Sequence, residues 1–464
     1  MDYDVLILGG GITGCAVAYE LSKYSLNIAL IEKEYDIADD VALINTAVVY
    51  DGIECVNTIT SKLEFMGNSL MKEVTSKFNV IFKRTGGLII AKDEAEKEKL
   101  LQLYDKAIRE GVKNIRLLDS EDVYKLEPNL NAKVIKALYS GNMGVVRPYD
   151  LAISYAEVAF DNGVNFKLEE EVLDIKKLSR GFRVETNKNK FTCKMVINTT
   201  PGRCYSIDNP SDEKIEHSGY LKYFLLEDEF KGNFSNILLS LSEEGERIYS
   251  IPSTQDGNIA AVSTLDNSTY NEAVKKISTL IDGIKEDNII SFYQSLFYKT
   301  PVLIDDSSVD KGYIKVLAKH YGEVTMSPAI AKIICETVVS NIKAKLKKDY
   351  HDKRREFYKF KELSNEEKNQ IISLDKRYGK VVCLCQQITE GEIVEAIRRP
   401  LGARTLEGVK RRTGSTLGNC QGAYCMSRIV SILARETGKK ITDVVKDSKG
   451  SNIILNRIKE FDGV

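Results

Sequence analysis

The fold of this chain is decided by the stretch Tyr3-Asp4-Val5-Leu6-Ile7-Leu8-Gly9-Gly10-Gly11-Ile12-Thr13-Gly14. Its first six residues are mostly apolar and rich in branched side chains, which is typical of a buried parallel strand. Small residues from Cys15 onward predict a helix, and residues 26–31 predict a second strand that ends at Glu32. A strand, a glycine turn, a helix, a strand and an acid in this order are the pattern of a dinucleotide-binding unit.

Each of the three glycines of the motif is needed at its position for a physical reason. Gly9 permits a tight turn, Gly11 lets the backbone approach a diphosphate, and Gly14 lets the helix pack closely on the strand. The diphosphate then lies at the helix N-terminus, where unpaired N–H groups and the helix dipole favour negative charge. Glu32 lies 18 residues beyond Gly14, where a carboxylate accepts hydrogen bonds from a ribose. The motif predicts a bound dinucleotide without choosing between FAD and NAD; a glycine-rich turn without a ligand is the alternative.

Composition narrows the class of protein. The chain has 464 residues, 43% hydrophobic and 29% charged, as expected for a globular protein of about three units. Its net charge of −1 argues against a protein that binds nucleic acid or an anionic membrane. The acidic start and the absence of a run of about 20 apolar residues predict no signal peptide, no transmembrane segment and a cytoplasmic location. Only three histidines are present, which excludes mechanisms that need several.

Four of the nine cysteines lie close together late in the chain. Cys383-Leu384-Cys385 is followed, after 34 residues, by a second pair formed by Cys420 and Cys425. Thiolates in such pairs bind soft metals and iron–sulfur clusters. Structural zinc more often uses two Cys-x-x-Cys pairs, so the spacing favours an iron–sulfur cluster. A zinc site and four buried structural cysteines are the alternatives.

Local signals predict the elements around these two motifs. Thr389 and Glu392 form a capping-box pattern at the start of a helix, and Thr405 begins the next one. Residues 217–264 read as an antiparallel sheet, and residues 326–345 as a helix that begins near Pro328.

Two family resemblances rest on these residues. The run from Val381 to Val445 resembles the [2Fe-2S] domain of the bacterioferritin-associated ferredoxin type, through Cys383-Leu384-Cys385 and residues 418–425. Residues 1–345 resemble the FAD-dependent oxidoreductases of the D-amino-acid-oxidase superfamily, and within it the anaerobic glycerol-3-phosphate dehydrogenase branch. Besides the glycine motif, the carrying stretches include Arg84-Thr85-Gly86-Gly87-Leu88, Gly144-Val145-Val146-Arg147-Pro148-Tyr149 and Val196-Ile197-Asn198.

The resemblance implies an α/β fold in which a Rossmann-like FAD-binding domain is combined with an antiparallel-sheet substrate domain and a small, mainly helical [2Fe-2S] domain. The FAD-dependent oxidoreductase part covers residues 1–345. Its FAD-binding segments are about 1–80, 145–215 and 310–345, and its substrate-side segments are about 81–144 and 216–309. A basic linker over 346–380, the [2Fe-2S] domain over 381–447 and a tail over 448–464 complete the expected organisation.

The resemblance also implies site residues. The FAD ligands would be Gly9, Gly11, Gly14, Glu32, Lys33, Asn45, Thr46, Val172, Thr199 and Gly322, and the cluster ligands Cys383, Cys385, Cys420 and Cys425. His320 precedes Gly322 and is the candidate base, while Tyr50, which stands where relatives often carry histidine, is a candidate donor to a substrate oxygen. The substrate-binding arginine of the family has no recognisable counterpart, which leaves Lys319 and Arg84 as possible anion anchors.

The implied reaction is hydride transfer to the flavin from a carbon that bears a hydroxyl or amino group. The electrons then leave singly through the [2Fe-2S] cluster to a partner, a second flavoprotein or another electron-acceptor subunit. Residues Asp40-Val41-Ala42 replace the usual hydroxyl-bearing loop of the family, so a diverged, non-catalytic relay or assembly subunit is one alternative. An amine or amino-acid dehydrogenase is another.

Overall fold

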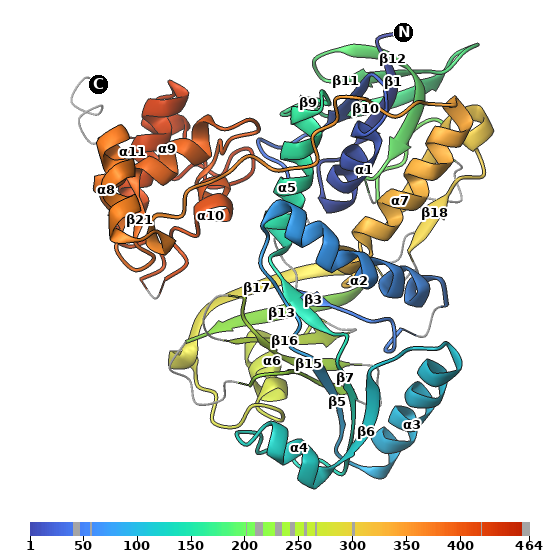
Figure 1. The fold of residues 1–464 in the computed structure, drawn as a ribbon, viewed down its shortest axis with the longest axis vertical. Coiled ribbons are helices and arrows are strands. Elements are labelled where there is room, and N and C mark those ends of the chain that lie inside the picture. Colours follow the sequence, from blue (N-terminus) through green and yellow to red (C-terminus); the bar gives the residue numbers. More distant parts are fainter. Residues whose placement is uncertain are drawn as a thin grey trace.

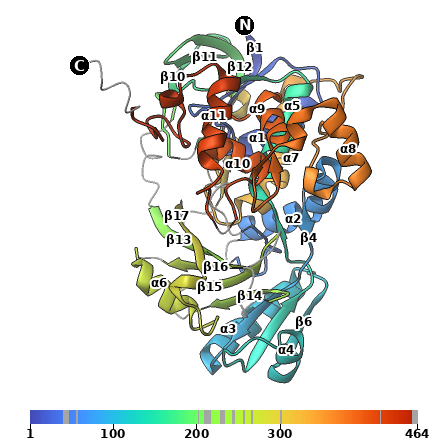
Figure 2. The ribbon, with the colours of Figure 1, turned by 90° about the vertical axis from the view of Figure 1, so that its left-hand side faces the viewer.

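The computed structural model shows three structural parts, two of them built on large sheets and the third, C-terminal one mainly helical (Figure 1). In both views the C-terminal part lies beside the part that contains the N-terminus (Figures 1 and 2). The structure describes residues 1–39, 47–55, 58–200, 202–208, 217–227, 234–241, 246–254, 258–264, 267–298, 302–418 and 420–456.

The first sheet is centred on the strand predicted from the opening residues. In this sheet β1 (Tyr3–Leu8) pairs in parallel with β2 (Ile28–Ile31) on one side and with β12 (Lys190–Asn198) on the other. The order is β10-β11-β12-β1-β2-β9, and β19 joins β12 in parallel while β18 pairs with β19. The other bounds are β9 (Asn165–Lys167), β10 (Val172–Lys177), β11 (Phe182–Thr186), β18 (Leu303–Asp305) and β19 (Tyr313–Leu317).

Both faces of β1 are buried, which explains its continuous apolar sequence. Val5 and Ile7 belong to a core formed with α1 (Ile12–Ser22), α5 (Pro148–Asp161) and α7 (Glu323–Ile342). Leu6 and Leu8 face the opposite side of the sheet, where they join a core with β10 and β11. The predicted strand–turn–helix–strand unit is therefore present.

The helix α7 begins earlier than the sequence suggests. It starts at Glu323, so Pro328 lies inside the helix rather than at its first turn. A proline has no N–H to donate to the carbonyl four residues earlier, here that of Val324. The hydroxyl of Ser327 donates to this carbonyl at 3.0 Å, which replaces the missing bond and lets the helix continue.

The second sheet is mainly antiparallel, with the order β17-β13-β16-β15-β14-β5-β7-β6 in the described residues. Its first half contains the antiparallel sheet predicted over 217–264, and a parallel pairing of β14 with β5 joins it to the second half. The strands are β5 (Gly87–Ala91), β6 (Ile115–Asp119), β7 (Lys136–Ser140), β13 (His217–Leu226), β14 (Ile237–Leu241), β15 (Arg247–Pro252), β16 (Asn258–Thr264) and β17 (Ile289–Tyr298), with helices α3 (Glu94–Arg109), α4 (Ser120–Leu126) and α6 (Tyr270–Ile277).

A small three-stranded sheet and the long helix α2 (Thr58–Phe78) complete this region. The small sheet has the order β3-β8-β4, with bounds β3 (Val48–Val49), β8 (Gly144–Val146) and β4 (Phe82–Lys83). In the described residues, no helix is both long enough and apolar enough to cross a membrane.

The C-terminal part contains the helices predicted between and after the cysteine pairs. Thr389 and Glu392 form the predicted capping box, with both reciprocal bonds present, at the start of α9 (Glu390–Arg398). Thr405 caps α10 (Leu406–Thr413) through a 2.9 Å bond from Gly408 N. The other elements are α8 (Asn365–Leu374), β20 (Val381–Cys383), β21 (Ile388–Thr389) and α11 (Met426–Thr437).

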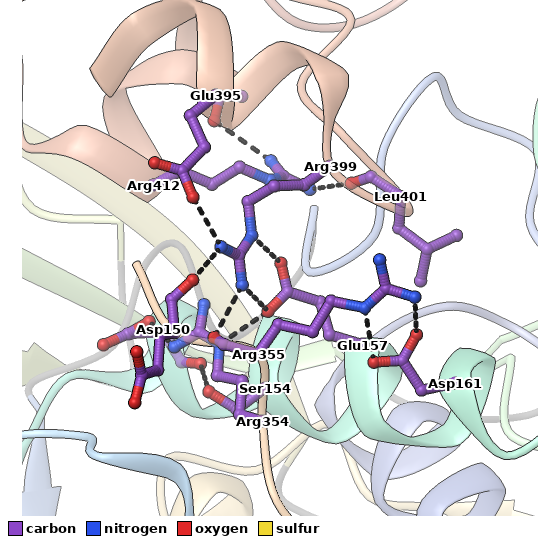
Figure 3. A network of polar contacts seen from close by, with 12 residues as sticks. Asp150, Ser154, Glu157, Asp161, Arg354, Arg355, Glu395, Arg399, Leu401 and Arg412 are labelled. Atoms are coloured by element: carbon purple, nitrogen blue, oxygen red, sulfur yellow. Dashed lines mark hydrogen bonds and ion pairs between the residues drawn. The ribbon is translucent and has the colours of Figure 1, made fainter. Parts of the chain in front are cut away.

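Buried ion pairs connect the C-terminal part to the first sheet's helices (Figure 3). Glu157 of α5 accepts hydrogen bonds from Arg354 Nε at 2.5 Å and from Arg399 Nε at 3.1 Å. Arg354 lies in the segment after α7, and Arg399 directly follows α9. Arg412 of α10 makes a second, bidentate contact with Asp36 at 2.6 and 2.7 Å. The C-terminal part is therefore held by charge pairs at two separate positions.

Candidate cofactor and active sites

A cavity of about 270 Å³ opens at the carboxyl ends of β1 and β2, where a parallel sheet of this kind binds its ligand. It is lined by most of the predicted FAD residues: Gly9, Gly11, Gly14, Glu32, Lys33, Val172 and Thr199. Asn45 and Thr46, as well as the altered stretch 40–42, lie outside the described residues. Gly322 lies next to Glu323, which is also part of the lining.

The glycine motif has the geometry that its spacing predicts. Gly9 has a φ of +101°, a conformation that favours glycine. A Cβ on Gly14 would lie 2.0 Å from the carbonyl oxygen of Gly9, so only glycine allows this close approach of helix and turn. Gly11 is the N-cap of α1 and has no side-chain capping bond, which leaves the helix N-terminus open toward the cavity.

Carboxylates at the end of β2 provide acceptors for a ribose or a base. Glu32 accepts bonds from Gly10 N at 2.6 Å and from Glu34 N at 2.9 Å, and burial raises the pKa of its carboxyl. Glu34 lines the same cavity, and its buried Oε2 has no hydrogen-bond partner. An adenosine fits this donor and acceptor set, because its hydroxyl and amino groups can donate to both carboxylates.

Two cations in the cavity were not predicted as FAD ligands. Arg203 lines it and pairs with Glu171 at 2.5 Å. Lys319, which the sequence suggested as a substrate anchor, also lines this cavity. The other candidate anchor, Arg84, donates to the Asn68 side chain at 2.7 Å and to the Asn142 carbonyl. No local sign in the sequence indicated that Arg203 and Lys319 line the FAD cavity, because both lie far from the glycine motif.

The candidate catalytic residues lie near the start of α7, whose N-cap is Gly322. Tyr50 packs edge-on against Tyr321 at 5.1 Å between ring centroids, and His320 lies 4.0 Å from the same ring. Glu64 of α2 also lies close by, since a Cβ on Gly322 would lie 2.3 Å from its Oε1. The structure thus brings Tyr50, His320 and Gly322 together, next to the predicted FAD cavity.

His320 is held as a neutral hydrogen-bond donor. Burial, and then the cation of Arg247, lower its pKa to about 3. Its Nδ1 accepts a bond from Gly322 N at 3.1 Å, so the ring proton of the neutral form is on Nε2. To accept a proton at Nε2, the neutral ring would first have to carry its own proton on Nδ1, and Nδ1 could then no longer accept the bond from Gly322 N. This geometry favours a donor role for His320 over the role of a base.

Arg247 and Glu54 also belong to this cluster, and sequence reasoning missed both. Arg247 lies at the start of β15 with its guanidinium 4.7 Å from the centre of the Tyr321 ring. Its Nε is 3.6 Å from Oε2 of Glu54. Burial raises the pKa of Glu54 to about 7, although Arg247 opposes the shift. A cation, a carboxyl that titrates near neutrality and a neutral histidine are therefore in one place.

The four predicted cluster cysteines form two pairs in the C-terminal part. The Cys385 thiol contacts Cys420 Sγ at 3.4 Å and lies at the surface. Cys383 and Cys425 are neighbours in the interior, each 1% exposed. Two thiol pairs suit a centre with two irons, each of which takes two thiolates.

The loop around Cys420 is built to hold a thiolate. A hydrogen bond from Cys385 lowers the pKa of Cys420, and backbone N–H groups of residues 422–424 act in the same direction. Burial raises the pKa of Cys425 to about 12, while Thr416 N donates to its sulfur. Gly418 is required beside the first pair, since a Cβ there would lie 2.4 Å from Cys385 Cβ. Backbone donors around the sulfurs are what an iron–sulfur centre needs.

Comparison with known proteins gives two family matches. Residues 4–337 match the FAD dependent oxidoreductase family, abbreviated DAO, and residues 381–435 match the BFD-like [2Fe-2S] binding domain. Together they include the glycine motif, the cluster around His320 and all four paired cysteines.

Curated relatives extend these matches. The chain is 35% identical to the glycerol 3-phosphate dehydrogenase of Caloramator mitchellensis, over 98% of this chain and 99% of that protein. It is 30% identical to the glycerol 3-phosphate oxidase of Mycoplasma pneumoniae over 49% of this chain and 58% of that protein.

Solved structures share the fold of the first two parts. An L-alpha-glycerophosphate oxidase from Mycoplasma pneumoniae with FAD bound has a TM-score of 0.68 at 22% identity, and covers 77% of this chain and 99% of its own. A glycine oxidase from Geobacillus kaustophilus has a TM-score of 0.62 at 17% identity, with coverages of 77% and 99%. The predicted fold class and both predicted cofactors, FAD and a [2Fe-2S] cluster, are therefore confirmed. This chain belongs to the FAD dependent oxidoreductase family and carries a BFD-like [2Fe-2S] binding domain at its C-terminal end.

Proposed function

We propose that this enzyme oxidises a small hydroxylated anion of the glycerol 3-phosphate type and passes the electrons singly to a partner redox subunit. The observation that carries the proposal is the similarity to a glycerol 3-phosphate dehydrogenase over 98% of the chain. That similarity includes the C-terminal part as well as the FAD-binding part. FAD supplies the hydride acceptor, and the [2Fe-2S] centre supplies one-electron transfer.

The residues of the chain have separate roles in this scheme. The N-terminus of α1 holds the FAD diphosphate, Glu32 accepts from the ribose, and Thr199 borders the adenosine half. Gly322 borders the flavin ring, and we assign Asn45 and Thr46 to the same ring. His320 donates from Nε2 to a substrate oxygen, and Tyr50 is a second donor. These assignments, and the division of the chain into domains at about 345, 380 and 447, are part of the proposal.

Electron exit toward a partner is supported by the exposure of one thiol pair. Cys385 is exposed and Cys420 is partly exposed in the full chain, so the FAD-binding part does not cover them. The neighbouring side chains of Leu384 and Tyr424 are 66% and 71% exposed. A partner flavoprotein or another electron acceptor that docks here would reach the outer pair of sulfurs directly.

The test is purification without oxygen, followed by measurement of flavin, iron and acid-labile sulfide per chain. The flavin absorbance is then recorded after addition of glycerol 3-phosphate, L-2-hydroxyglutarate or glycine. Bleaching by glycerol 3-phosphate alone supports the proposal. Bleaching by glycine points to an amino-acid dehydrogenase, and a cluster without flavin or without bleaching by any substrate points to a relay subunit.

A further inference from the structure

The guanidinium of Arg247 is placed to bind an anion. Its side chain is 20% exposed, while Tyr50, Tyr321 and Glu54 around it are each below 10%. In the described part of the chain the guanidinium donates no hydrogen bond, and its one ion pair is the 3.6 Å contact of Nε with Glu54. Its terminal nitrogens therefore present a planar fork, stacked on Tyr321, that can take an oxyanion in two parallel bonds.

Glu54 is a weak occupant of that fork. Both of its carboxyl oxygens are buried and neither has a hydrogen-bond partner in the described residues. A buried carboxylate without hydrogen bonds is costly, and a contact of 3.6 Å to one guanidinium nitrogen compensates little of that cost. An incoming anion that fits the fork would outcompete Glu54, which would then lie beside a second negative charge.

We propose that Arg247 binds the anionic group of the substrate, and that Glu54, its counter-ion in the absence of substrate, takes up one proton from solvent when the anion enters. Arg247 thus replaces the family arginine that the sequence lacks. The ligand class is a phosphate or carboxylate that also carries a hydroxyl group. Its role as substrate rests on the proposed function, whereas binding of an anion can be measured without turnover.

The groups that face Glu54 determine the direction of the proton uptake. Arg247 lowers the pKa of Glu54, and Asp51 raises it. When an anion neutralises Arg247, the first effect is lost and a negative charge is added, so the pKa of Glu54 rises further above about 7. Binding then weakens as the pH rises through and above 7. The other titratable groups of the cluster are Tyr50, Glu64, Tyr249, His320 and Tyr321.

Of these other groups, His320, Tyr249 and Tyr321 do not change charge near neutrality. Burial, and then the charge of Arg247, hold the pKa of His320 near 3, and burial together with Glu54 holds Glu64 protonated well above its usual range. Burial raises the pKa of Tyr249 and of Tyr321 well above the usual value, so these two hydroxyls stay protonated near neutrality. Glu54 is the carboxyl that contacts Arg247, at 3.6 Å, so we assign the pH dependence of anion binding to it, and Glu54→Gln distinguishes it from Glu64.

The first test is isothermal titration of the FAD-loaded full chain with sulfate, whose charge is constant near neutral pH. Arg247→Met should weaken sulfate binding by about 10-fold to about 100-fold, the effect of a lost charged hydrogen-bond pair. The matched control is Arg116→Met, since Arg116 also stacks on a tyrosine of the second sheet, at 4.8 Å, but lies at the surface. Unchanged binding in Arg247→Met would overturn the assignment of the anchor.

The second test uses Glu54→Gln, which keeps the shape of the side chain and removes its titration. In the wild type, sulfate affinity should fall between about pH 6 and about pH 8.5, by at most about tenfold per pH unit. In Glu54→Gln the affinity should be nearly independent of pH and tighter than the wild type at the upper end. A wild-type slope in this variant would refute the proton uptake, and this test remains decisive if Arg247→Met fails to fold.

The two proposals can fail separately. If Arg247→Met loses sulfate binding but the wild type does not oxidise glycerol 3-phosphate, the anion site is supported and the proposed substrate is refuted. If Arg247→Met oxidises glycerol 3-phosphate with an unchanged KM, the proposed substrate is supported and the role of Arg247 as anchor is refuted. A KM raised about 10-fold or more, with a smaller change in kcat, is the result expected if both are right.

Discussion

Replacement of Glu157 by glutamine should release the C-terminal part from the FAD-binding part. Glu157 is 2% exposed and receives bonds from both Arg354 and Arg399 (Figure 3). Breaking a buried ion pair costs about 3–5 kcal/mol. The lower end of this range applies, because Arg354 keeps its ion pair with Asp150 at 2.7 Å and Arg399 keeps its ion pair with Glu395 at 3.2 Å. A loss of about 3 kcal/mol raises the undocked fraction by about 100-fold.

Limited proteolysis of the full chain measures this fraction. Cleavage in the segment 346–380 tracks the open population when opening is fast, so the rate should rise by about 100-fold in Glu157→Gln. The matched control is Asp161→Asn, one helical turn further along α5, whose pair with Arg355 is largely exposed on the arginine side. That exposed pair is worth at most about 1 kcal/mol, so cleavage should rise by less than about fivefold. Equal cleavage rates for Glu157→Gln and the wild type would refute the role of this contact.

The same residue predicts an effect of acid on docking. Burial acts to raise the pKa of Glu157, but Arg354 and Arg399 outweigh it and hold the pKa below its usual value. The carboxylate therefore stabilises the docked form above about pH 4.3, and this contribution is lost as the pH falls through the lowered pKa. Proteolysis of the wild type in the segment 346–380 should accelerate only below about pH 4.

Three further predictions concern the two cofactor sites. Gly14→Ala should lose FAD but keep its iron, because the new Cβ would lie 2.0 Å from the Gly9 carbonyl; a normal flavin content would contradict the close packing. Cys420→Ser should lose the cluster without unfolding the first two parts, since the cores are separate, and unchanged iron would exclude this ligand. His320→Gln should lower kcat by about 10-fold to about 100-fold with normal flavin content, and, because the pKa of His320 is about 3, without removing any step near pH 6.5 from the wild-type kcat profile. Such a step, if abolished by the substitution, would restore His320 as a base.

Local sequence signals predicted most of the fold. The glycine motif predicted β1, α1 and β2 because Gly9 and Gly14 each answer a short-range steric demand. Thr389 and Thr405 marked helix starts because a capping bond joins residues three apart. The predicted start of α7 was wrong, because Pro328 lies inside the helix, where the hydroxyl of Ser327 donates to the carbonyl that the proline leaves without a partner. Pro328 alone indicated an early helical turn.

The candidate substrate site could not be predicted in this way, because local sequence signals do not report long-range contacts. Arg247 and Glu54 meet although 192 residues separate them in the sequence, and neither belongs to a motif. An arginine in a strand and a glutamate in a loop are ordinary surface residues until the sheet order brings β15 close to Tyr50 and His320. Long-range pairing of this kind has no local signature, whereas the four cysteines could be recognised because they occur in the sequence as two closely spaced sets, Cys383 with Cys385 and Cys420 with Cys425.

The position of α10 links the two cofactor sites. Its Arg411 pairs with Asp39 at 2.8 Å, and Asp39 lines the FAD cavity. Beyond its C-terminal end, Thr416 N donates to the sulfur of Cys425. The segment from α10 to Thr416 therefore contacts both the FAD cavity and the inner pair of cluster ligands. Solvent reaches only the outer pair, Cys385 and Cys420, so under the proposed function this is the pair from which a partner would take electrons.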